Sequence, residues 1–113
     1  MYPSPTRVAL TLAVMLKRSG KTRARVSDKT FRLVSRRTNL RGAFVTSVRE
    51  WLEDFGVFAT ELDRGGFALV AISALDGAPP ITAKQLLPAP ERKKITDEAL
   101  LAELDLSVNE HED

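Results

Sequence analysis

The stretch SDKTFRLVSRRTNLRGAFVTSVREWLEDFGVFATELDRGGFALVAIS, residues 27–73, decides the fold of this 113-residue chain. It opens with a Ser-Asp pair, either member of which can cap a helix that runs to about Arg37. Phe31 and Val34, assisted by Leu33, are expected to form the buried side of this helix. Asn39 and the threonine before it favour a turn, because both side chains compete for backbone hydrogen bonds. The beginning of the stretch therefore predicts a helix followed by a turn.

A second helix follows within the same stretch. Apolar residues recur there at helical steps of three or four: Phe44, Val48, Trp51, Leu52 and Phe55. Gly56 is a suitable C-terminal stop. We expect this stripe to join the core, with Trp51 buried against the first helix and the hairpin.

The end of the stretch predicts a β-hairpin. Residues 57–63 and 67–73 are rich in strand-forming side chains, and Arg64-Gly65-Gly66 joins them. A three-residue connection that contains glycine is a hairpin signal.

Upstream of the stretch, residues 5–19 predict a helix. Ser4 can cap it, Pro5 suits its first position and Gly20 suits its end. Apolar residues at helical spacing form its buried side: Val8, Leu12, Met15 and Leu16, beside Ala9 and Ala13. The alternation of Val8, Leu10, Leu12 and Val14 also permits a strand. Residues 22–26 alternate as well and allow a short strand with one basic face.

The order helix, short strand, helix, turn, helix, hairpin resembles a winged helix-turn-helix domain. The resemblance is carried by four motifs: Ser27–Phe31 opening the second helix, the Arg37–Leu40 turn, the Trp51–Val57 close of the third helix, and a wing tip at Asp63–Phe67. It covers residues 5–73. It implies an α+β fold of three helices and a β-hairpin wing, with a C-terminal helical extension after it.

We therefore expect three regions: residues 1–75 as the winged helix-turn-helix domain, residues 76–95 as a Pro-containing linker, and residues 96–113 as an amphipathic helix and acidic tail. The helix is expected from about Thr96 to Leu106. Its apolar side consists of leucines: Leu100, Leu101 and Leu104.

Charge is divided unevenly along the chain. Residues 1–49 contain 12 Lys or Arg and one acid, Asp28, for a net charge of +11. Residues 50–113 contain five bases and 14 acids, for a net charge of −9. A block this basic is typical of a polyanion-binding face.

The resemblance and the charge together nominate DNA-binding residues. In winged helix-turn-helix domains the third helix usually enters the major groove, which nominates Arg41, Thr46 and Arg49 for base contacts. Arg64 of the wing would reach the minor groove or the backbone. Five further candidates are phosphate contacts: Lys29, Thr30, Arg32, Arg36 and Arg37. Asn39 is a turn residue whose side chain can also bind adenine.

Several function classes are disfavoured. The chain has no cysteine and a single histidine, His111, so we expect no catalysis, no metal and no cofactor. The longest apolar run, residues 8–16, is far shorter than the roughly 20 residues that a membrane span needs. We expect a soluble, cytoplasmic protein without a cleaved leader.

These observations predict a sequence-specific double-stranded DNA-binding protein, a small transcriptional regulator or accessory factor. The leucine face of the last helix suggests a homodimer. The alternative is a winged-helix protein-interaction module, such as a phage-type inhibitor or assembly adaptor, whose acidic half binds a protein partner. RNA is a third option, which the scarcity of exposed aromatic residues disfavours.

Overall fold

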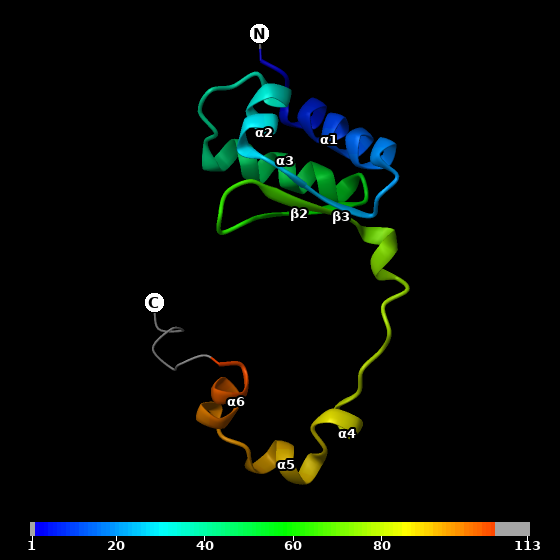
Figure 1. Ribbon diagram of the computed structural model, residues 1–113, viewed down its shortest axis with the longest axis vertical. Coiled ribbons are helices and arrows are strands. Elements are labelled where there is room, and N and C mark those ends of the chain that lie inside the picture. The colour runs from blue at the N-terminus through cyan, green and yellow to red at the C-terminus, as the bar shows by residue number, and fades with distance from the viewer. Residues whose placement is uncertain (1, 106–113) are drawn as a thin grey trace. The chain divides into compact units, whose positions relative to one another are not determined.

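The computed structural model describes residues 2–105 and divides the chain into two compact units, Met1–Ala78 and Pro79–Asp113 (Figure 1). The first unit is of the α+β class. Its elements in chain order are α1 (Pro5–Ser19), β1 (Arg23–Val26), α2 (Asp28–Ser35), α3 (Gly42–Asp54), β2 (Val57–Glu61), β3 (Phe67–Ala71) and the short 3-10 helix η1 (Ile72–Leu75).

Both helix starts predicted from capping residues are confirmed. The Arg7 N–H donates to Ser4 Oγ (3.1 Å) at the start of α1, and Gly20 ends that helix at φ 73°. Ser27 Oγ accepts from the Thr30 N–H (3.1 Å) at the start of α2. The helix α2 is shorter than expected, because Arg36 adopts a left-handed conformation (φ 57°) that stops it after Ser35.

The three strands form one antiparallel sheet in the order β1-β3-β2. The short first strand and the hairpin are thus both confirmed, and β3 lies at the centre. Each hairpin strand ends two residues earlier than the sequence suggested. The Leu62 N–H donates to Gly66 O and closes the turn, while the Ile72 N–H donates to Gly56 O where η1 begins. This arrangement is compatible with a winged-helix layout.

The core lies between the sheet and the helices α1, α2 and α3. Its residues are all buried: Val8, Ala9, Leu12, Leu16, Val26, Phe31, Val45, Val48, Leu52, Val57, Ala59, Phe67 and Leu69. Phe31 of α2 packs between two other aromatic rings, with its ring centroid 4.6 Å from that of Phe67 and 6.4 Å from that of Phe44.

The expected burial of Trp51 is wrong. Its side chain is 39% exposed and stacks on Phe55 at a centroid distance of 5.9 Å. The buried row of α3 runs through Val45, Val48 and Leu52 instead. Successive helix residues are about 100° apart, so Trp51 falls beside this row once Leu52 points inward. Met15 is 39% exposed for the same reason, one position before the buried Leu16.

Up to residue 105, the second unit contains three short helices: α4 (Ala83–Leu86), α5 (Ala89–Lys94) and α6 (Asp97–Glu103). Two of them lie where we expected a linker. Thr96 caps α6, with its Oγ1 accepting from the Ala99 N–H (3.2 Å). Leu106, the expected end of this helix, and the acidic tail after it lie outside the described residues. No helix between residues 2 and 105 is both long and apolar enough to cross a membrane.

Candidate nucleic-acid interface

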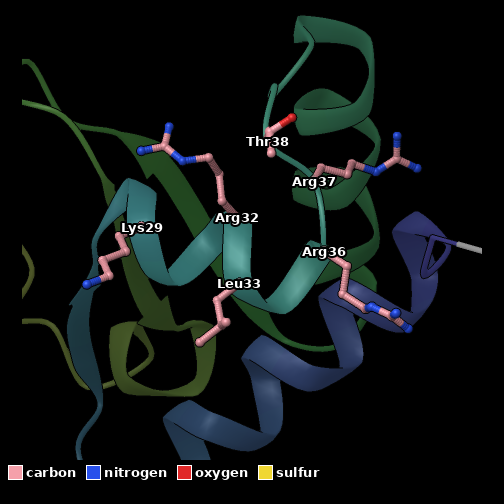
Figure 2. A pocket seen from close by; sticks show the side chains of 6 residues that line it. All are labelled: Lys29, Arg32, Leu33, Arg36, Arg37 and Thr38. Carbon is pink, nitrogen blue, oxygen red and sulfur yellow. The ribbon is translucent and has the colours of Figure 1, made fainter.

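A basic hollow lies on the surface of α2 and the connection that follows it. Six residues line it: Lys29, Arg32, Leu33, Arg36, Arg37 and Thr38 (Figure 2). Four of them are cationic, and none of these lining residues, all within the described range, is acidic. We call this surface the basic hollow.

Helical spacing on α2 explains why the cations gather there. Phe31 and Ser35 are four residues apart and both are buried, which fixes the inward side of the helix. Lys29, Arg32 and Leu33 project away from that side. Leu33, which we expected to assist the core, is 77% exposed and lines the hollow. The two-residue step from Phe31 to Leu33 turns the helix by about 200°, so spacing alone identifies it as exposed.

The backbone at the end of α2 positions two consecutive arginines, Arg36 and Arg37. The Arg36 N–H donates to Leu33 O (3.3 Å) and the Arg37 N–H donates to Arg32 O (3.1 Å), which closes the helix. Figure 2 shows the side chains of Arg36 and Arg37 extending to one side of the hollow, and that of Arg32 to the other. The backbone of Arg36 is strained at φ 57°, because a left-handed conformation costs a non-glycine residue about 1–2 kcal/mol.

Arg37 is held by two aromatic rings. Its guanidinium carbon lies 4.0 Å from the ring centroid of Phe44 and 5.1 Å from that of Tyr2. Both distances are within the range of cation–π attraction. Its Nε is buried and has no hydrogen-bond partner among the described atoms. Arg37 therefore links α3 to the segment before α1, a role that no local sequence pattern indicates.

The helix α3 begins close to the hollow and changes charge along its length. Arg41 is its N-cap and is exposed, as is Thr46 in the second turn. Further along, the exposed side becomes acidic with Glu50, Glu53 and Asp54. The positive end of the helix dipole thus coincides with the basic end of the helix.

Arg49 has a structural contact instead of an outward position. It is half-buried, and its Nε donates to the carbonyl of Ala59 in β2 (2.9 Å). This bond ties α3 to the sheet. Among the three residues nominated for base contacts, only Arg41 and Thr46 are exposed on α3.

The hairpin turn is anchored to the start of α2. The Gly66 N–H donates to Asp28 Oδ1 (3.1 Å), and a Cβ on Gly66 would lie 2.7 Å from the carbonyl oxygen of Val26. Asp28, the one acid of the basic half, is therefore used inside the fold. Arg64 is exposed in this turn, whose Gly66 is bonded to Asp28, the first residue of α2.

Two candidates occupy other positions. Thr30 is half-buried and its hydroxyl accepts from Ser27 Oγ (3.1 Å), which supports the cap of α2. Asn39 is exposed in the connection between α2 and α3, next to the basic hollow.

Comparison with known proteins finds no matching family model, no matching curated protein and no matching solved structure.

Proposed function

We propose that the compact unit binds double-stranded DNA as a winged helix-turn-helix domain and acts as a small transcriptional regulator or accessory factor. The sheet order β1-β3-β2, joined to three helices, supports the winged-helix assignment. The single observation that carries the function is the basic hollow, which four cations line with no carboxylate among its lining residues.

Such a grouping favours a polyanion. Cations held close together repel one another, and a ligand with repeated negative charges relieves this repulsion while releasing its own counterions. Duplex DNA has one charge per roughly 1.7 Å of axis. Lys29, Arg32 and Arg36 line the hollow and are the phosphate contacts of the proposal. Phosphate contacts of this kind fix position without reading sequence.

Base contacts are assigned to the start of α3. Arg41 can bind guanine through two hydrogen bonds, and Thr46 can contact either base type. Beyond them, Glu50 and Asp54 would meet phosphate with like charge. The proposal therefore has α3 approach the groove by its first two turns, with Arg64 of the hairpin turn on the neighbouring backbone.

Salt dependence of duplex binding tests the hollow. The variant Arg32→Gln/Arg36→Gly removes two cations, and glycine at position 36 keeps the left-handed backbone without strain. Removal of one phosphate contact should lower the slope of log affinity against log salt by about 0.9. The matched control Arg92→Gln/Lys93→Gln removes the same charge from α5. Equal slopes for the two double variants would overturn the assignment.

Base reading is tested by selection from randomised duplexes. Arg41→Gln should relax the preference at one base pair by roughly 1–3 kcal/mol. If this variant keeps the preferred site and binds every duplex more weakly, Arg41 contacts phosphate and α3 does not read sequence through it.

A protein partner is the second candidate, which the exposed acids of α3 favour: Glu50, Glu53 and Asp54. A basic protein surface would match them. If the folded protein binds no duplex at low salt, the proposal of DNA binding fails and a protein partner replaces it.

A further inference from the structure

A second surface of the compact unit is apolar and faces solvent. Leu10 and Val14 of α1 are each 44% exposed, and Trp51 of α3 is 39% exposed. Leu10, Val14 and Phe55 line one hollow, and Trp51 stacks on Phe55. These four side chains form a continuous surface across the two helices, which we call the α1–α3 strip.

The strip has a basic edge on α1. Arg7 and Arg18 share a hollow with Leu10 and Val14, and Phe55 does not line that hollow. Both arginines are exposed. Lys17 and Lys21 line the hollow that contains Phe55. Basic charge is therefore also present between the two helices, near the C-terminal end of α1.

The opposite edge, on α3, is acidic. Glu50 and Asp54 are one position before Trp51 and Phe55 respectively, and both are exposed. Since residues four apart lie in one row along a helix, Glu50 and Asp54 form a row parallel to that of Trp51 and Phe55. The strip thus has cations along one edge and carboxylates along the other.

The two edges also run in the same direction. Tyr2, just before α1, and Phe44, in the first turn of α3, hold the same guanidinium of Arg37. At the other ends of these helices, Leu16 and Phe55 line one hollow. The starts of α1 and α3 therefore lie together, as do their ends. Arg18 is accordingly at the same end of the strip as Asp54.

We propose that the α1–α3 strip is an interface between two copies of this chain. In a two-fold dimer the same surface serves both partners. If the two-fold axis runs parallel to the strip, the α1 edge of one copy lies against the α3 edge of the other. The basic edge of each copy then meets the acidic edge of its partner. In the centre, Leu10 and Val14 of each copy then face Trp51 and Phe55 of the other copy.

The distribution of charge favours a second copy over another occupant. An acidic helix would match Arg7 and Arg18 but meet Glu50 and Asp54 with like charge, and a basic helix would do the reverse. A copy of the same surface satisfies both edges at once. This interface differs from the leucine face of residues 96–106, and it is independent of whether the protein binds DNA.

The oligomeric state of the full chain gives the first test. Sedimentation equilibrium over a concentration series should show a dimer, and Trp51 emission should move to shorter wavelength as dimers form. Trp51→Ser should raise the dissociation constant at least tenfold, since truncation of a central aromatic residue commonly costs about that factor or more. Leu33→Ser removes a more exposed leucine outside the strip and should leave the constant unchanged. A monomer at every concentration would overturn the proposal.

Exchange of the edges gives the second test. Arg7→Glu/Arg18→Glu makes both edges acidic, and Glu50→Lys/Asp54→Lys makes both basic, so each variant alone should dissociate at low salt. An equimolar mixture should form heterodimers, because the edges of one variant are then opposite in charge to the edges of the other. Circular dichroism checks that each variant is folded, as expected for exposed positions. Two folded variants that stay monomeric when mixed would contradict the two-fold arrangement.

Discussion

The basic hollow and the α1–α3 strip are two surfaces of one compact unit, and they differ in how charge is arranged. The hollow has charges of one sign around Leu33, so only a ligand of the opposite sign complements it. The strip has both signs, separated by apolar side chains, so it can complement a copy of itself. Net charge alone would have assigned both surfaces to the same polyanion. The arrangement of the charges separates a proposed DNA contact from a proposed dimer contact.

The largest effect on stability is expected from a substitution in the core beneath the two surfaces. It tests whether Phe31 belongs to that core and Trp51 to the surface. Phe31 is 2% exposed and contacts Phe44 and Phe67. Phe31→Ala should lower the free energy of unfolding by about 3–5 kcal/mol. Trp51→Ala should cost much less, because the ring is already partly in solvent. Urea denaturation at low protein concentration measures both, and equal losses would contradict the assignment of Trp51 to the surface.

The next effect concerns the anchored hairpin turn. Gly66 has φ +83° and lies against the Val26 carbonyl, so Gly66→Ala should destabilise by at least about 1–2 kcal/mol. Gly42 has no atom within 4 Å of an added Cβ, and Gly42→Ala should stabilise α3 by up to about 1 kcal/mol. Thermal unfolding of the two variants should therefore shift in opposite directions. A lower melting temperature for both would disprove the contrast.

A smaller effect separates two arginines of α3. Arg49→Gln removes the hydrogen bond to Ala59 and should cost about 1 kcal/mol of stability. It should leave the base preference of the protein unchanged. Arg41→Gln should do the opposite, with little loss of stability and a changed preference. Denaturation and duplex selection on the same two proteins measure this, and a changed preference for Arg49→Gln would restore its nomination as a base reader.

The smallest effect is expected at Leu33. Because its side chain is 77% exposed, Leu33→Ser should change the free energy of unfolding by no more than about 0.5 kcal/mol. Denaturant unfolding detects a larger change, which would mean that Leu33 contributes to the core after all.

Local features of the fold were predictable from sequence because their causes are local. Ser4, Ser27 and Thr96 cap helices with their own side chains, and Gly20 ends α1 by its backbone freedom. The order of elements in the first unit and the hairpin connection followed from spacing and turn residues. Lys29 and Arg32 belong to one surface for a local reason as well, since helical geometry puts residues three apart on one side.

The sequence by itself determined the helices and strands of the first unit, the α+β class and the concentration of positive charge in residues 1–49. Tertiary structure decided which of several apolar residues that fit one stripe are inside, and which charges remain outside. Val45 and Trp51 both fit a helical stripe, and the packing of α1 and the sheet selected Val45. Arg49 and Asp28 bind Ala59 and Gly66, which are distant in sequence, and so are drawn into the fold. Such contacts depend on where other segments arrive, and local spacing contains no information about that.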